Sequence, residues 1–474
     1  MAEKEPLKSR WFAFAVCLAI AVVPFLTPPP DGLTEQGWRL LGVFVATIVS
    51  FLLRPFPMGL MVMLALTGLA ASGTLEFESI LVGGFSKKVV WLVVAAFLIA
   101  GAVGRTGFGR RIALTLVTWF GRSTLGLGYS VCAAELALGP VVPSNTARGG
   151  GILAPIVDSL SGALGSSATD RPERAGRYLV LVASHANLIT AAMFLTGMAA
   201  NGLVAEAASE HLGIEFGWGT WALGAIVPGL VGLALLPLFV YRLARPTISD
   251  AGAAREQARS SLAEMGPWSR GQITLAVVFV LMLGLWTTKS LHGFHEGLVA
   301  WIGVCALIVT GTEKWSDVTG NAKAWDTLIW LGGLLAMANA LGDTGVVAYF
   351  KEMMEGQVVG LAPVAVVLVL CLIYFYSMYA FSMFTAHISA FVGAFFVVAA
   401  ATQAPPVLMA AMFGYFSNLC GCMTNYSTGP VVIYFGLGYV PVGQWFRVGA
   451  LMSLFHLSIW LTVGMAWWKI LGWW

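Results

Sequence analysis

The stretch Gly139-Pro140-Val141-Val142-Pro143-Ser144-Asn145-Thr146-Ala147-Arg148-Gly149-Gly150-Gly151 determines how the rest of the chain is interpreted. It places three adjacent hydrogen-bonding side chains, two prolines and a guanidinium between two apolar arms. A bare charge or unsatisfied polar group in lipid is costly, so such backbone at membrane depth is buried in protein or lines a wet cavity. We therefore predict that residues 123–157 form a re-entrant hairpin with its tip at a binding site.

The composition of the whole chain agrees with a membrane setting. Of 474 residues, 58% are hydrophobic and 10% are charged, whereas soluble domains contain about 25% charged residues. These values predict an all-α polytopic membrane protein. The net charge of +3 is small, so no nucleic-acid partner is expected. The six cysteines stand mostly in apolar runs and are interpreted as small buried hydrophobes without a metal or disulfide role.

Apolar runs close to the length of a bilayer-spanning helix occur along the whole chain. Basic residues precede the first run and acidic residues follow it, so the positive-inside rule places the N-terminus in the cytoplasm. A bacterial inner membrane is expected from the Ala- and Gly-rich sequence without a transit peptide. The predicted spans are 11–27, 37–54, 57–74, 88–105, 177–204, 217–241, 271–288, 294–311, 325–342, 360–381, 406–419 with 427–440, and 446–470.

A charged linker at 244–270 divides the chain into two halves, 1–243 and 271–474. Each half begins with hydrophobic spans and then carries a similar phrase, Gly104-Arg105-Thr106-Gly107 in the first and Gly342-Asp343-Thr344-Gly345 in the second. A polar interruption follows in each half. Internal repeats with interrupted helices are typical of secondary transporters that bind substrate near the middle of the membrane. We therefore predict two inverted repeats, each with a re-entrant hairpin and a broken helix.

A basic residue follows the threonine of each polar tip by two positions. The second tip is Met383-Phe384-Thr385-Ala386-His387, at the start of a predicted hairpin over 383–401. His387 is interpreted either as a neutral imidazole bound to a backbone carbonyl or as a charged group at the binding site. Arg148 cannot be neutralised. It either pairs with Glu135 on the preceding arm or contacts an anion, and the two contacts could alternate during a transport cycle.

Small polar residues also interrupt two long apolar runs. They are Thr196-Gly197 with Asn201 in the first half, and Thr424-Asn425 before Gly429-Pro430 in the second. Breaks of this kind expose helix ends whose amides favour anions. The alternative is that the glycines only permit close helix packing.

The residues of the first tip carry a resemblance to a known family. Pro143-Ser144-Asn145-Thr146-Ala147-Arg148-Gly149-Gly150-Gly151-Ile152 resembles the first signature of the divalent anion/sodium symporter family, close to its 2-oxoglutarate/malate translocator and dicarboxylate exchanger branch. The similarity extends over essentially the whole chain. Three further stretches agree with it: Met193 to Asn201, Thr385 to Ala390, and Thr424 to Pro430.

The resemblance implies a homodimer in which each protomer has a scaffold domain and a transport domain that moves like an elevator. It implies that the two tips bind the carboxylates of a C4 to C6 acid. Ser144, Asn145 and Thr146 would bind one end, and Thr385 the other. The second tip departs from the family pattern, because Met383-Phe384 stands where the symporters have Ser and Asn. The remaining candidate contacts are Arg148, His387, Thr196, Thr424 and Asn425.

The same departure bears on sodium coupling. In sodium-coupled members the tips also help to build two sodium sites, whereas exchangers of the family resemble this chain in carrying a base beside each tip. Arg148 and His387 are therefore expected to replace carried sodium, and no cofactor or metal is expected. Two fixed positive charges would be matched by a dianion, and the empty carrier, with unpaired charge to desolvate, would move slowly.

The expected function is sodium-independent obligatory exchange of dicarboxylates such as succinate, malate or 2-oxoglutarate. A sodium-coupled dicarboxylate symporter is the first alternative. A membrane-embedded enzyme is the second, although the sequence contains neither His-Glu-x-x-His nor Gly-x-Ser-x-Gly. A channel or structural role fits the polar broken helices less well.

Overall fold

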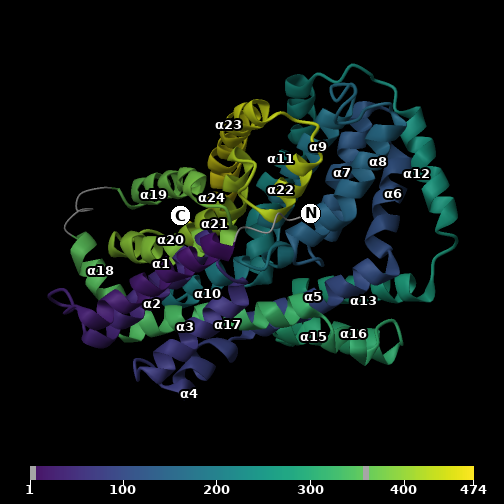
Figure 1. Ribbon diagram of the computed structural model, residues 1–474. Helices are drawn as coiled ribbons and strands as arrows, with labels where there is room; N and C mark the ends of the chain where they lie inside the picture. Colours follow the sequence, from purple (N-terminus) through teal and green to yellow (C-terminus); the bar gives the residue numbers. More distant parts are fainter. Residues whose placement is uncertain (1–6, 356–361) are drawn as a thin grey trace.

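The computed structural model describes residues 7–355 and 362–474, and all regular elements within these ranges are helical (Figure 1). In the same ranges, nine helices are long and apolar enough to cross a membrane. The prediction of an all-helical polytopic membrane protein is confirmed. One isolated antiparallel β-bridge, between Ser123 and Asp250, also occurs in the described part of the chain.

The helices of the first half are α1 (Leu7–Leu26), α2 (Glu35–Leu53), α3 (Met58–Ala71), α4 (Phe77–Ile80), η1 (Leu81–Phe85), α5 (Lys88–Thr106), α6 (Phe108–Phe120), α7 (Thr124–Leu138), η2 (Thr146–Leu153), α8 (Ala154–Ala163), α9 (Gly176–Met193), η3 (Leu195–Gly197), α10 (Asn201–Leu212) and α11 (Trp218–Ala244). The remaining helices are α12 (Gly252–Glu264), α13 (Arg270–Thr287), α14 (Lys289–His292), α15 (Glu296–Val309), α16 (Trp315–Thr319), α17 (Ala322–Asp343), α18 (Val346–Glu355), α19 (Pro363–Ser377), η4 (Met378–Ala380), α20 (Phe384–Ala401), α21 (Pro406–Leu419), η5 (Cys420–Met423), α22 (Gly429–Gly436), α23 (Val442–Ile459), η6 (Trp460–Gly464) and α24 (Met465–Ile470).

The order of elements in the first half recurs in the second. In each half a helix, a polar tip and a second helix are followed by a buried helix, a short 3-10 turn, a short helix and a long one. The similar sequence motifs that precede the two tips, at 104–107 and 342–345, also have similar local structure. The hydroxyl of Thr106 donates to Ala102 O at 2.8 Å, and that of Thr344 donates to Ala340 O at 2.7 Å. The sequence repeat therefore has a counterpart in local structure.

The second tip begins at Met383, after α19, and continues as the first turn of α20, and the two helices contact each other. The sequence analysis placed residues 360–381 as a separate span and the hairpin at 383–401. In the structure the segment before the tip, α19, occupies the position that α7 has before the first tip. The difference arises because the apolar run of α19 has the composition of an ordinary span.

The charged linker contains the helix α12. This helix packs against α6 and α8, at the right of Figure 1. Two long-range bonds fix its position: Thr124 N donates to Ser249 O at 2.9 Å, and Arg255 Nε donates to Thr118 O at 2.7 Å. The linker is therefore attached to the hairpin of the first half.

The helices pack around two centres. Almost every residue of α9 is buried, and α7, α8, α11, α21 and α22 pack against it. The second centre is α17, which packs against α2, α3 and α5, while α15 joins α5 to α13. This second group forms the lower part of the molecule in Figure 1. The polar tips and the two helix breaks belong to the first group or adjoin it.

Candidate functional site

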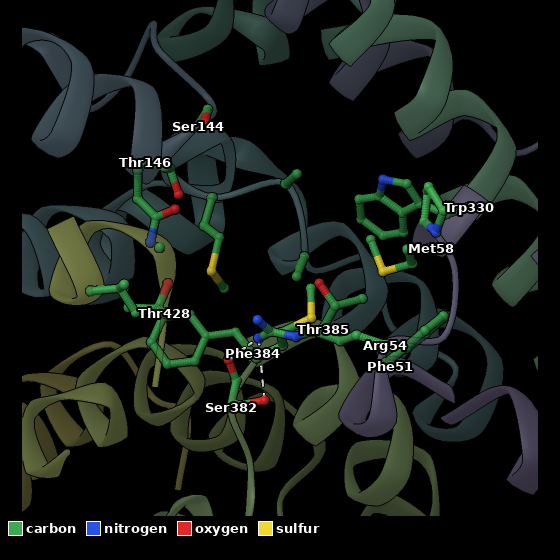
Figure 2. A pocket seen from close by; sticks show the side chains of 18 of the residues that line it. Phe51, Arg54, Met58, Ser144, Thr146, Trp330, Ser382, Phe384, Thr385 and Thr428 are labelled. Atoms are coloured by element: carbon green, nitrogen blue, oxygen red, sulfur yellow. Dashed lines mark hydrogen bonds between the residues drawn. The ribbon is translucent and has the colours of Figure 1, made fainter. Parts of the chain in front are cut away.

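A cavity of about 1420 Å³ lies where the two polar tips face each other. Its polar lining includes Ser144, Asn145 and Thr146 from the first tip and Thr385 from the second. Figure 2 shows Ser144 and Thr146 on one side of this space and Thr385 with Ser382 on another. Four of the nine predicted contacts are therefore brought together from segments far apart in the sequence.

Local hydrogen bonds fix the backbone of the first tip and leave a side-chain donor free to bind a ligand. The hydroxyl of Ser144 accepts from Ala147 N at 3.1 Å, and the backbone oxygen of Asn145 accepts from the Asn187 amide at 3.1 Å. The side-chain nitrogen of Asn145 is buried and has no partner among the described residues. A buried donor without an acceptor costs about 1–3 kcal/mol. This amide is therefore suited to an acceptor that enters the cavity.

Glycine allows the first tip to pack against the helix break of the second half. A Cβ atom on Gly429 would lie 2.4 Å from the hydroxyl oxygen of Thr146, and one on Gly150 would lie 2.2 Å from the Ile433 side chain. Both separations are too short for a real side chain. Gly150 and Gly429 are thus required for the close approach of tip and break. For Gly429 of the second break, close packing is thus one role of the glycine.

The Arg148 guanidinium lies behind the first tip, fully buried, and does not line the cavity. Its Nε donates to Glu135 Oε2 at 2.5 Å. Its Nη1 donates to Val142 O at 2.8 Å and to Gly197 O at 3.2 Å. The Glu135 carboxylate also accepts from Asn187 at 2.9 Å. The guanidinium therefore ties the first tip to the first helix break.

His387 occupies the matching place behind the second tip. Its ring is fully buried. Its Nε2 lies 3.0 Å from Tyr374 O and 2.8 Å from the Ser377 hydroxyl. The ring centre is 4.2 Å from that of Tyr374. His387 thus links the start of α20 to the end of α19, the two arms on either side of the tip.

The second tip is more apolar than the first. Met383 and Phe384 both line the cavity beside Thr385. The Phe384 ring packs against the helix break of the same half, where a Cβ atom on Gly421 would lie 2.4 Å from it. The phenyl ring therefore fills space at the place where the family pattern has a polar side chain.

Of the polar residues of the two helix breaks, Thr428 lines the cavity, whereas the predicted contacts Thr196, Thr424 and Asn425 lie outside its lining. Thr196 donates to Pro140 O at 2.5 Å and accepts from the Trp218 indole at 2.9 Å. Thr424 is buried with an unpartnered hydroxyl, and Asn425 is half-buried. The two breaks meet through Asn418, whose amide donates to Asn201 Oδ1 at 2.9 Å.

Sequence analysis missed two arginines and two hydroxyl residues that line the cavity: Arg10, Arg54, Ser50 and Thr428. Arg10 and Arg54 stand at the ends of apolar spans, where basic residues are common at a membrane surface. Their position at the cavity depends on tertiary contacts, over 45 residues from Arg10 to Pro55 and over 328 from Arg54 to Ser382, for which the sequence carries no local signal.

Comparison with known proteins gives a consistent picture. The family model described as the sodium:sulfate symporter transmembrane region matches residues 8–474. The chain is 41% identical to the putative malate transporter YflS of Bacillus subtilis (strain 168), covering 97% of this chain and 96% of that protein. It is 38% identical to the chloroplastic dicarboxylate transporter 1 of Arabidopsis thaliana, with 96% and 82% covered.

Two further similarities concern the membrane and the fold. The chain is 33% identical to the inner membrane protein YbhI of Escherichia coli (strain K12), covering 98% of this chain and 99% of that protein. Among solved structures it is similar to the YdaH transporter of Alcanivorax borkumensis, with a TM-score of 0.57, 14% identity, and 86% and 90% of the two chains covered. At that identity the likeness shows the fold alone.

Proposed function

The chain belongs to the sodium:sulfate symporter family, the divalent anion/sodium symporters that its first tip resembles, and from this premise we propose that it transports dicarboxylates such as malate. The family is one of transporters, so the alternative of a membrane-embedded enzyme is excluded. Relatives named as malate and dicarboxylate transporters support the choice of substrate.

The observation that carries the proposal is the cavity between the tips. The charged residues that line it are Arg10 and Arg54. Among the described residues that line it, none is acidic. Asn145 offers an unpartnered amide on one side, and Thr385 offers a hydroxyl on the other. Two separated groups of donors suit an anion with a carboxylate at each end. Arg148, His387, Thr196, Thr424 and Asn425 would then support the tips from behind, without contact to the substrate in this state.

We further propose that transport is independent of sodium. Backbone carbonyls at unwound helix breaks are the groups that bind Na⁺ in many secondary transporters. Here the carbonyls of Val142 and Gly197 accept hydrogen bonds from Arg148, and Tyr374 O lies within hydrogen-bond distance of His387. A side chain thus takes the place of a carried cation beside each tip. Sodium-coupled symport is the alternative that the family description keeps open.

The Glu135 ion pair changes the charge balance expected from the sequence. Because Glu135 neutralises Arg148 within the protein, this arginine does not by itself balance a substrate carboxylate. The obstacle to an empty return would instead be buried donors without partners at the tips, such as the Asn145 amide. Each 1.4 kcal/mol added to the barrier slows movement about tenfold. Exchange, with little net flux, is the mode that this arrangement favours.

The finer architecture is proposed on the resemblance. The helices packed around α17 would form the scaffold, and those around α9 the transport domain that moves as an elevator. The recurring element order supports two inverted repeats over 1–243 and 271–474. A homodimer in a bacterial inner membrane, with the N-terminus in the cytoplasm, completes the proposal. The relative named as an inner membrane protein is consistent with that location.

A binding measurement tests the substrate class. Malate, succinate and 2-oxoglutarate are each expected to raise the melting temperature of the purified protein in detergent, without conversion to product. A ligand at 100 times its Kd stabilises the folded state by about 2.7 kcal/mol. Lactate and acetate, which carry one carboxylate, serve as controls and should leave the melting temperature unchanged. Stabilisation by sulfate with no response to any dicarboxylate would contradict the proposed substrate class.

A further inference from the structure

Arg54 reaches into the cavity from a helix end that belongs to neither tip. It is the residue that ends α2, with a left-handed backbone at φ 50° and ψ 47°. Its N–H donates to Ser50 O at 2.8 Å. For a residue other than glycine this conformation is unfavourable. The strained cap turns the chain sharply before Pro55 and places the arginine side chain at the cavity.

The Arg54 guanidinium is incompletely satisfied. Its Nη2 donates to the backbone oxygen of Ser382 at 3.1 Å and to the Ser382 hydroxyl at 3.2 Å. The other N–H groups of the guanidinium have no acceptor in the part of the chain that the structure describes. Figure 2 shows this side chain pointing into the open space beside Ser382. A guanidinium presents five donors in a fork that matches a carboxylate, so an anion would complete its bonding.

A second cation lies beside it. Arg10 Nε donates to Pro55 O at 2.7 Å, and its guanidinium carbon lies 4.1 Å from the centre of the Phe56 ring. Arg10 is thus held against the two residues that follow Arg54. Neither arginine forms an ion pair with a described residue. Two unpaired positive charges at a cavity concentrate anions there, since low-dielectric walls focus the field.

We propose that Arg54 and Arg10 form a receiving site for the dicarboxylate, in which a substrate carboxylate replaces Ser382 as the acceptor of Arg54 before the tips enclose the anion. The inference rests on the proposed function and adds two residues outside both tips to it. Because Ser382 adjoins the second tip, loss of its bond to Arg54 would also free that tip to close.

The receiving site serves one face of the membrane. Arg54 caps the end of α2 and Arg10 lies on α1. Besides α20, α2 packs against α3 and α17 of the group assigned to the scaffold. A transport domain that moves past the scaffold leaves these arginines behind. The anion therefore meets them when it enters or leaves on the side to which the present cavity opens, and not on the opposite side.

Kinetics measured separately on the two faces test this inference. Exchange of labelled malate would be followed in right-side-out and inside-out vesicles for the wild type, Arg54→Gln and Arg10→Gln. For Arg54→Gln, KM is expected to rise about tenfold on one face, as loss of a charged contact predicts. On the other face, KM is expected to stay within about twofold of the wild-type value. On both faces, kcat is expected to stay within about twofold of the wild-type value. Arg10→Gln should shift KM on the same face by a smaller factor.

Two controls separate this role from general damage. Arg259→Gln removes the same charge from the exposed face of α12, where Arg259 lies 3.7 Å from Glu256, and should change KM on neither face. Arg54→Lys keeps the charge without the fork and should recover part of the loss. Equal KM changes on both faces, or no change on either, would overturn the receiving site. Absence of malate exchange by the wild type would instead refute the proposed function.

Discussion

Replacement of Arg148 by methionine is expected to abolish exchange and to destabilise the protein. The substitution leaves the Glu135 carboxylate fully buried without its cation. Removal of one partner of a buried ion pair costs about 3–5 kcal/mol. It also removes the bonds to Val142 O and Gly197 O that tie the first tip to the first helix break. Thermal unfolding in detergent and exchange in proteoliposomes measure the two effects.

The double variant Glu135→Gln with Arg148→Met separates these effects. Without the lone carboxylate, the melting temperature should return toward that of the wild type. Exchange should stay at least about 100-fold below the wild type, because the carbonyl oxygens beside the tip still lack their cation. Recovery of exchange in the double variant would show that Arg148 serves only to neutralise Glu135.

The second large effect is expected from Asn145→Asp. The substitution nearly preserves shape and replaces the unpartnered amide at the cavity by an acceptor that carries negative charge. Like charges brought together at a binding site cost several kcal/mol, and each 1.4 kcal/mol is a tenfold change in affinity. Exchange at malate concentrations below KM should fall at least about 100-fold. Radiolabelled malate exchange in proteoliposomes measures it.

Asn145→Ala is the matched control for this prediction. It removes the amide without adding charge and should weaken malate binding about tenfold, as loss of a hydrogen bond to a charged group predicts. Asn145→Ala should keep a melting temperature close to that of the wild type in the absence of malate. If Asn145→Asp and Asn145→Ala lose activity equally, the Asn145 side chain does not face the substrate carboxylate.

Much of the fold follows from local patterns in the sequence. Apolar runs of bilayer length predict the spans, and the glycine-rich tip at 139–151 with the breaks at 196–201 and 424–430 predicts where helices are interrupted. These features depend on the solvation of backbone polar groups, which is a local matter in a membrane. The polar tip residues Ser144 and Thr385 could be predicted for the same reason.

The charges of the site were less predictable. The sequence left Arg148 open between Glu135 and an anion, and a distance of 2.5 Å between the side chains establishes the ion pair in this state. Arg54 lies 328 positions from the residue that accepts its hydrogen bonds. In sequence it resembles an ordinary arginine at the end of a membrane span. Only the packing of α2 beside α20 brings it to the second tip.

The central claim is that this chain exchanges dicarboxylates without sodium, and one assay tests it directly. Uptake of labelled malate into proteoliposomes would be measured with and without internal malate, each in sodium and in choline buffer. The account predicts uptake that requires internal dicarboxylate and is the same in both buffers. Uptake that requires a sodium gradient and proceeds without internal dicarboxylate would contradict it.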